Sequence, residues 1–125
     1  IAAILTDEEL QRLSEYGKRL GLSILLEIHT LQEYERVKDL YVDMIGVNSR
    51  DLNTFKIDKD NAKEIIKAID RNRFIVAESG MESAKDIEDF RKAGADAFLI
   101  GTFLMKKNDL KSAFEELYRG FINVC

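Results

Sequence analysis

The chain has 125 residues, of which 46% are hydrophobic and 34% charged, and its formal net charge is −4. This balance predicts one ordinary globular domain spanning residues 1–125 and excludes a disordered chain. Because Lys alternates with Glu and Asp along the sequence, there is no basic stripe of the kind that a nucleic-acid partner requires.

The apolar runs of the chain are short. Residues 24–28 and 98–100 are examples, and neither is long enough to cross a bilayer, so no membrane contact is expected. The one cysteine, Cys125, cannot form an internal disulfide, and its terminal position argues against a catalytic or metal-binding role. These features predict a cytoplasmic protein.

The first residues predict a strand and then a helix. Residues 1–5 are apolar and do not start with Met, and we interpret them as the tail of a buried strand in a fragment of a longer protein. Thr6 followed by Glu9 is a capping-box pattern, which predicts a helix of about four turns that ends at Gly21. The predicted apolar face of this helix consists of Leu10, Leu13, Gly17 and Leu20.

Further along the chain, short apolar segments alternate with helical patterns. The predicted strands span residues 23–28, 43–47, 74–77 and 97–100, and the first of them is predicted to be buried on both faces. Helix starts are predicted at a second capping box of Thr30 and Glu33, at Ser83 and at Asn108, and Gly94 is predicted to end the helix that Ser83 begins. The predicted inward side chains are Tyr34, Val37 and Leu40, then Ala62, Ile65, Ile66 and Ile69, then Ala84, Ile87, Phe90 and Ala93, and finally Leu110, Ala113, Phe114, Leu117 and Phe121.

This alternation indicates the α/β class, with parallel strands covered by helices. Two architectures satisfy it: an open doubly wound sheet, or part of an eight-unit (β/α)8 barrel. In both, functional groups gather at the carboxyl ends of the strands. The residues at those ends are Glu27, Asn48, Arg50, Glu78, Ser79, Gly80, Gly101 and Thr102. Two acids, an amide, a guanidinium and two glycine turns suit a small anionic substrate.

Glu27 and Glu78 each end an apolar strand, where partial desolvation would raise the pKa of a carboxyl group toward the range useful for proton transfer. Alternatively, each pairs with a neighbouring Lys or Arg. The Ser79-Gly80 and Gly101-Thr102 turns could present backbone N–H groups to a phosphate, with residues 101–105 forming the short extra helix of such sites, or could be turns without a ligand.

Three other polar residues have open roles. Arg50 could hold a substrate carboxylate in a two-pronged contact, or could bridge Asp51 or another loop acid. Asp51 is expected to brace its loop. His29 follows Glu27 by two residues, so it should lie on the same face or just beyond, but without companions it does not indicate a metal site.

Four segments together resemble one family. Residues 26–29 (Leu-Glu-Ile-His), 45–52 (Ile-Gly-Val-Asn-Ser-Arg-Asp-Leu), 76–80 (Val-Ala-Glu-Ser-Gly) and 99–102 (Leu-Ile-Gly-Thr) resemble the second half of indole-3-glycerol phosphate synthase. The similarity spans essentially the whole chain. It implies an eight-unit barrel in which residues 1–5 end strand four and the later strands are five to eight.

The resemblance also implies an activity. That family is a carbon–carbon lyase of tryptophan biosynthesis, which closes the ring of a carboxylated anilino-deoxyribulose phosphate with loss of carbon dioxide and water. No metal or organic cofactor is implied. The implied catalytic residues are Glu27 for proton transfer, Glu78 for stabilising positive charge near the anilino nitrogen, and Asn48; the implied substrate-binding residues are Arg50 and Ser79; and the implied phosphate-binding residues are Gly80, Gly101 and Thr102.

One departure from the family concerns lysine. The family's general-acid lysine and a second substrate-contacting lysine belong to early strands that this sequence lacks, and Lys106 and Lys107 are not at matching places. We therefore expect this chain alone to be inactive or nearly so. A half-barrel would also need the missing N-terminal half, or self-association through its open strand edges.

Two other functions were considered. Another phosphate-binding barrel, such as phosphoribosylanthranilate isomerase, is opposed by the Asn-x-Arg-Asp segment that begins at Asn48. A non-catalytic open α/β interaction module, like a receiver domain, would need a phosphorylatable Asp where Asn48 stands.

Overall fold

The computed structural model describes residues 1–52 and 54–122, so Asn53 and Cys125 lie outside the described residues. Its helices and strands alternate along the chain. They are the 3₁₀ helix η1 (Ala2–Ile4), α1 (Asp7–Arg19), β1 (Leu25–Ile28), α2 (Leu31–Val37), β2 (Met44–Asn48), α3 (Lys59–Ala68), β3 (Phe74–Glu78), α4 (Ala84–Ala93), β4 (Ala97–Leu99), α5 (Thr102–Met105) and α6 (Leu110–Ile122).

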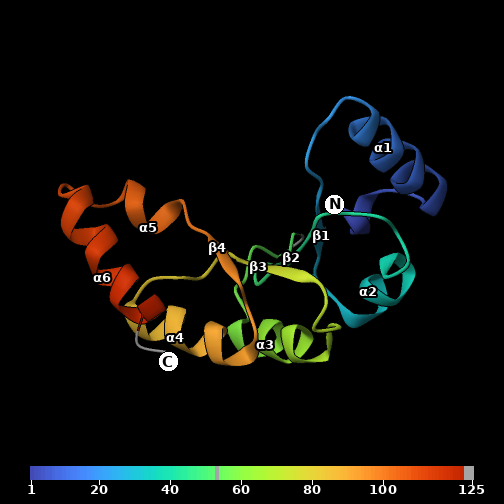
Figure 1. Ribbon diagram of the computed structural model, residues 1–125. Coiled ribbons are helices and arrows are strands. Elements are labelled where there is room, and N and C mark those ends of the chain that lie inside the picture. The colour runs from blue at the N-terminus through green and yellow to red at the C-terminus, as the bar shows by residue number, and fades with distance from the viewer. Residues whose placement is uncertain (53, 123–125) are drawn as a thin grey trace.

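The strands form one parallel sheet with the order β1-β2-β3-β4. A doubly wound sheet reverses its strand order at a switch point, whereas a barrel adds each strand beside the previous one. The observed order is that of the barrel. Figure 1 shows the helices in an arc along one side of the sheet, and no helix of the described residues covers the other, concave side. The fold is therefore half of a (β/α)8 barrel.

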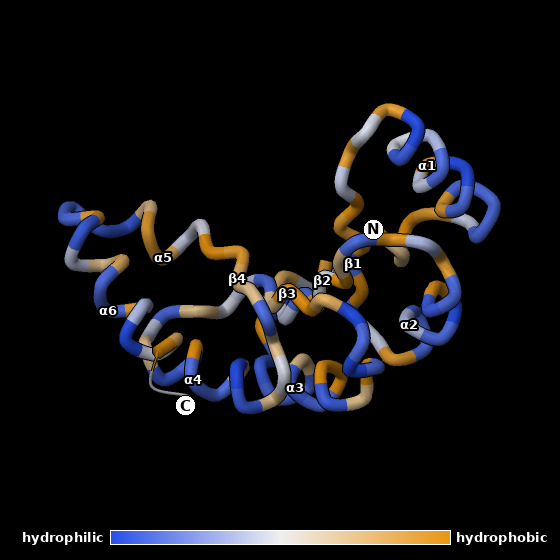
Figure 2. Tube along the Cα trace, viewed as in Figure 1, coloured by the Kyte–Doolittle hydropathy of each residue, from blue (hydrophilic) through white to orange (hydrophobic). Residues whose placement is uncertain are grey.

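The hydrophobic core lies between the convex face of the sheet and the helices. Its largest fully buried side chains are Phe90, Ile28, Ile45, Ile65, Ile66, Ile75, Ile87, Val37 and Val47. Figure 2 shows the strands as mostly hydrophobic and the helices as alternating hydrophilic and hydrophobic segments along their length. This is the pattern expected where each helix turns one stripe toward a buried sheet.

Most predicted helix ends are confirmed. Thr6 and Glu9 form both hydrogen bonds of the capping box, and Ser83 caps α4. Gly94 ends α4 with a φ of 121°, a conformation that L side chains rarely adopt. The second capping box is only half formed. Thr30 Oγ1 accepts from the Glu33 N–H, but the Glu33 carboxylate accepts from the N–H of His29, one residue earlier than predicted.

The prediction that residues 1–5 end a strand was wrong. Residues Ala2–Ile4 form a 3₁₀ turn, closed by a bond of 3.4 Å from the Ile4 N–H to the Ile1 carbonyl. The ladder of β1 pairs with β2 alone within the described residues, so this segment has no backbone partner that would hold it extended.

Two helices expose part of their predicted apolar faces. In α1, Leu10 and Gly17 are buried, whereas Leu13 and Leu20 are 51% and 60% exposed. In α6, Ala113 and Leu117 are buried, but Leu110 and Phe114 are each 60% exposed. The apolar stripes of these helices are wider than the surface that the described chain offers to cover them.

The final helix also begins later than Asn108. Ser112 N–H and Oγ both donate to the Asp109 carboxylate, which makes Asp109 the cap of α6. None of the helices in the described part of the chain is both long and apolar enough to span a membrane.

Candidate active site at the carboxyl ends of the strands

The strand register brings the predicted acids together on the concave face. Glu27 of β1 is level with Gly46 of β2, and Asn48 of β2 is level with Glu78 of β3. Side chains two residues apart on a strand point to the same side, so all of these face the open side of the sheet. Gly46 lies on the strand between the two acids, and it has no side chain to fill the space between them.

Glu27 is oriented by Asn48. Asn48 Nδ2 donates to Glu27 Oε1 over 2.8 Å, and the Asn48 Oδ1 atom in turn accepts from the Arg50 N–H over 2.9 Å. The amide of Asn48 therefore has both of its ends fixed, and it holds one carboxylate oxygen of Glu27 in place.

Glu78 is the most perturbed acid of the site. Its side chain is 4% exposed, and Oε1 has no hydrogen-bond partner among the described residues. Burial, followed by the charge of Glu27 and a hydrogen bond between the two carboxyl groups, raises the pKa of Glu78 to about 7. Glu78 is thus able to hold a proton near neutral pH while it lies beside Glu27. The predicted raised pKa is thus present at Glu78.

Arg50 lies at the start of the loop that follows β2. Its Nη1 donates to the Phe55 carbonyl over 3.1 Å. The loop is held by Asp51, whose Oδ1 accepts from the N–H and Oγ1 of Thr54 over 2.6 and 3.0 Å. As predicted, Asp51 braces the loop.

A pocket of about 360 Å³ opens beside these residues, between the ends of β2, β3 and β4. It is lined by every predicted site residue except Glu27: Asn48, Arg50, Glu78, Ser79, Gly80, Gly101 and Thr102. Ser79 and Gly80 both have positive φ, 65° and 78°. A serine in this region is strained, and such strain is found mostly at functional turns.

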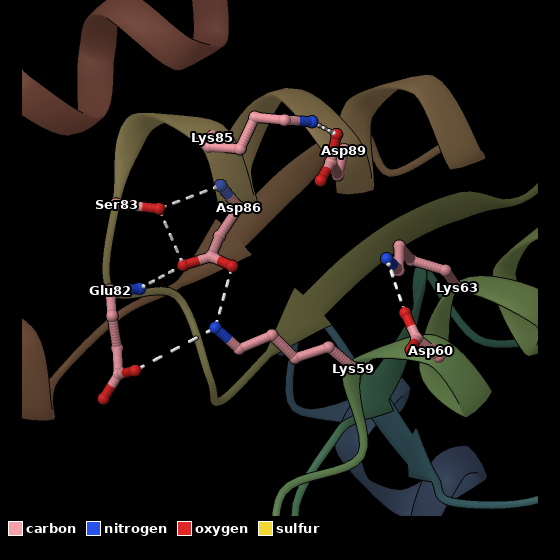
Figure 3. A network of polar contacts seen from close by, with 8 residues as sticks. All are labelled: Lys59, Asp60, Lys63, Glu82, Ser83, Lys85, Asp86 and Asp89. Carbon is pink, nitrogen blue, oxygen red and sulfur yellow. Dashed lines mark hydrogen bonds and ion pairs between the residues drawn. The ribbon is translucent and has the colours of Figure 1, made fainter.

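Figure 3 shows the polar contacts that link Lys59 to Glu82 and Asp86, which follow this strained turn in the sequence. Lys59, at the start of α3, donates to Asp86 Oδ1 over 2.7 Å, and Asp86 Oδ2 accepts from the Glu82 N–H and from Ser83 Oγ, both over 3.0 Å. The stem of Lys59 also lies against Gly80, where an added Cβ would be 3.3 Å from its Cε. The loop between β3 and α4 is therefore tied to α3.

A larger hollow, of about 680 Å³, lies between α1 and residues 36–41. It contains none of the predicted site residues. Two of its cations are already paired within the chain, Lys18 with Asp43 and Arg36 with Asp7. The candidate site is therefore the one at the strand ends and not this hollow.

His29 lies beside the candidate site, which the sequence alone did not establish. Its Nε2 lies 3.2 Å from Glu27 Oε1, and its Nδ1 lies 3.6 Å from Glu33 Oε2. The spacing of two residues from Glu27 was the signal for the shared face. No group of three potential metal ligands occurs among residues 1–52 and 54–122.

Comparison with known sequences identifies relatives. The sequence model of the indole-3-glycerol phosphate synthase family matches residues 1–117. The chain is 42% identical over 117 residues to the indole-3-glycerol phosphate synthase of Koribacter versatilis, covering 94% of this chain and 45% of that protein. It is 39% identical over 119 residues to that of Aquifex aeolicus, covering 94% and 46%. The chain thus spans about half the length of the curated relatives that it matches.

Solved structures show the same fold at low identity. Thiamine phosphate pyrophosphorylase from Pyrococcus furiosus superposes with a TM-score of 0.70 at 20% identity, covering 89% of this chain and 55% of that one. A mandelate oxidase variant superposes with a TM-score of 0.69 at 16% identity, covering 96% and 40%. These likenesses establish the half-barrel, whereas the sequence match establishes the family: the chain belongs to the indole-3-glycerol phosphate synthases.

Proposed function

We propose that this chain forms one half of the active site of an indole-3-glycerol phosphate synthase, which closes the ring of a carboxylated anilino-deoxyribulose phosphate in tryptophan biosynthesis, with loss of carbon dioxide and water. The observation that carries the proposal is the pair of carboxyl groups of Glu27 and Glu78 at the strand ends, in which Asn48 orients Glu27. Family membership supports the same reaction.

A proton held by the carboxyl pair of Glu27 and Glu78 would suit the proposed ring closure. When one carboxyl group of the pair holds the proton, the other is ionised, so the site offers an acid and a carboxylate at the same time. In the proposed reaction Glu27 transfers a proton during dehydration. Glu78, in its ionised form, stabilises the positive charge that develops near the anilino nitrogen. Asn48 and Arg50 bind and orient the substrate.

The phosphate would bind at the turns after β3 and β4. Gly80 and Gly101 line the pocket, and an added Cβ at Gly101 would meet no heavy atom within 4 Å, so a ligand can approach its backbone. The Thr102 hydroxyl, at the start of α5, would supply a further donor, with Ser79 nearby.

A second half-barrel would complete this site. The concave face exposes large apolar side chains at Leu25, Phe74 and Leu99, which are 39%, 48% and 57% exposed. β1 and β4 are the edges of the sheet. Their unpaired backbone N–H and C=O groups can form hydrogen bonds with strands of another chain. We propose that the N-terminal half-barrel occupies this place, and that without it the chain associates with a second copy through the same edges.

Joining the halves tests the proposal. The N-terminal half of the Koribacter versatilis relative is fused to Ile1, and formation of the indole ring is followed by fluorescence. The fused protein is expected to turn over, whereas the chain alone is expected to be inactive or nearly so, because the family's general-acid lysine belongs to the other half. Glu27→Gln in the fused protein should lower kcat by about 100-fold or more.

Glu64→Gln is the matched control, because Glu64 is 69% exposed on the outer surface of α3 and pairs with Lys67 at 2.7 Å. It should leave kcat unchanged. A fused protein that unfolds cooperatively and binds phosphate but forms no product would contradict the proposed reaction. Normal turnover by the chain alone would contradict the need for a second half.

A further inference from the structure

His29 lies between two carboxylates at the end of β1. Its side chain is 12% exposed, with Nε2 3.2 Å from Glu27 Oε1 on one side and Nδ1 3.6 Å from Glu33 Oε2 on the other. Neither ring nitrogen meets hydrogen-bond geometry with a partner among the described residues. A buried imidazole usually has at least one firm hydrogen bond, and the groups placed to interact with these two ring nitrogens are the carboxyl groups of Glu27 and Glu33.

Glu33 holds His29 in two ways. One of its carboxylate oxygens accepts from the backbone N–H of His29 over 2.7 Å, and the same oxygen faces the ring. Glu33 itself is fixed at the start of α2, because its own N–H donates to Thr30 Oγ1 over 3.1 Å. A capping carboxylate that would ordinarily turn back to the cap residue is thus directed toward the active site.

On the far side of the ring, Glu27 Oε1 is enclosed by two groups, Asn48 Nδ2 at 2.8 Å and His29 Nε2 at 3.2 Å. Glu27 has no direct backbone donor in the described residues that would fix its rotamer. Its approach to Glu78 therefore depends on the two side chains that flank it.

We propose that His29 is a positioning residue, which holds the Glu27 carboxylate against Glu78 and is itself held by Glu33. The inference rests on the proposed function in one respect: it takes Glu27 and Glu78 to be the catalytic pair. It adds to that function a chain of contacts from the first turn of α2, through His29, to the site.

The pKa of Glu78 depends on how close the Glu27 carboxyl group lies, so a change in this pKa shows that Glu27 has moved. The groups that act on Glu78 are its burial and the nearby carboxyl group of Glu27, through its charge and a hydrogen bond. If Glu27 moves away, the pKa of Glu78 falls, while burial keeps it above the ordinary value. The titration is followed by NMR in the chain with ¹³C at the glutamate carboxyl carbons, and Glu78→Gln assigns the signal.

Four variants distinguish the contacts. His29→Leu removes both ring nitrogens, and His29→Gln restores a donor toward Glu27. Glu33→Gln keeps an acceptor for the His29 N–H but removes the charge that faces Nδ1. Glu35→Gln is the control, because Glu35 lies on the same helix, is 63% exposed and pairs with Lys38.

In the parent chain the titration midpoint of Glu78 is expected at about 7. His29→Leu should lower it by about one unit, the effect of moving one nearby like charge, and His29→Gln should restore most of the difference. Glu33→Gln should shift it in the same direction by less, and Glu35→Gln should not shift it.

An unchanged midpoint in both His29→Leu and Glu33→Gln would overturn the inference. If His29→Leu does not fold, the difference between Glu33→Gln and Glu35→Gln decides alone. These measurements need no turnover, so they stand even where the fused protein forms no product. In an active fused protein, His29→Leu should lower kcat about tenfold with little change in KM, as expected when a group acts mainly in the transition state.

Discussion

The carboxyl group of Glu78 lies across strand β2 directly over Gly46. A Cβ atom added at position 46 would stand 3.0 Å from the Glu78 carboxyl carbon and closer still to Oε1. The register sets Gly46 level with Glu27 on one side and Val76 on the other. The missing side chain therefore provides the space through which Glu78 reaches Glu27.

Gly46→Ala should displace the Glu78 carboxyl group and destabilise the fold by about 1–3 kcal/mol, the usual range for overpacking a buried site. Urea denaturation measures this loss. Gly101→Ala is the control, because its Cβ would meet no heavy atom within 4 Å, and its stability should change by no more than about 0.5 kcal/mol. Adding Glu78→Ala to Gly46→Ala should recover about 1 kcal/mol through their coupling, and strict additivity would contradict the overlap.

Glu78 should also make stability depend on pH. Its pKa is about 7 in the folded chain against an ordinary value of 4.5, so the folded state binds the proton more tightly than the unfolded state. The stability that the protonated group contributes is fully present below the unfolded value and is lost as the pH rises through the folded one. The difference corresponds to about 3 kcal/mol at most.

Glu78→Gln cannot ionise, so we expect it to unfold at higher urea concentration than the parent at about pH 8 and to show a flatter pH dependence above about pH 5. Urea midpoints measured across that range provide the check, with Glu64→Gln as the exposed control. If parent and Glu78→Gln lose stability equally as the pH rises, another group is responsible for the slope.

Local signals in the sequence were enough to predict most elements. The helix caps at Thr6 and Ser83 and the left-handed end at Gly94 depend on residues within one turn of each other, so they can be read without knowledge of the fold. Glu27 and Glu78 could be predicted as strand-end residues for the same reason, because an apolar run that stops at an acid is a local pattern.

The features that escaped prediction depend on distant partners. Periodicity identified the apolar stripe of α6, but it could not show that Phe114 stays 60% exposed in the described chain. The overlap of Glu78 with Gly46 requires the register between β2 and β3, which no single strand encodes. The place of His29 beside Glu33 requires the relative position of β1 and α2.

Two helical glycines should respond to alanine in opposite ways. At Gly120 in α6, an added Cβ would stand 2.8 Å from the Ala84 carbonyl carbon and 2.9 Å from its Cα, and closer to its oxygen, all of them backbone atoms of α4. At Gly17 in α1, it would stand 2.6 Å from Cδ1 of Ile24, the end of a flexible side chain.

Alanine favours a helix over glycine by about 1 kcal/mol. Gly17→Ala should therefore be neutral or stabilising, because Ile24 can turn away. Gly120→Ala should instead cost about 1–3 kcal/mol net, because the α4 backbone cannot give way. Amide exchange in α6 and urea midpoints measure both. Equal effects at the two positions would show that α6 does not pack on α4 through Gly120.

Two lysines of α3 pair with carboxylates at nearly equal distances, 2.7 Å for Lys59 with Asp86 and 2.8 Å for Lys63 with Asp60, yet only the first pair braces the site (Figure 3). The side chain of Asp86 is 18% exposed, whereas that of Asp60 is 92% exposed. Burial alone would raise the pKa of Asp86, but its contacts with Lys59, the Glu82 N–H and Ser83 outweigh burial and lower it.

Lys59→Met should therefore cost about 1 kcal/mol near neutral pH, because it leaves a partly buried carboxylate without its cation, while Lys63→Met should change stability by less than about 0.5 kcal/mol. Since the pKa of Asp86 is lowered by folding, this contribution is present above the ordinary aspartate range and disappears as the pH falls through the lowered value. Hydrogen exchange at the Glu82 amide, which donates to Asp86, should quicken in Lys59→Met only. Equal exchange in the two variants would mean that Lys59 does not hold the turn of Ser79 and Gly80, and that the turn keeps its left-handed backbone without support from α3.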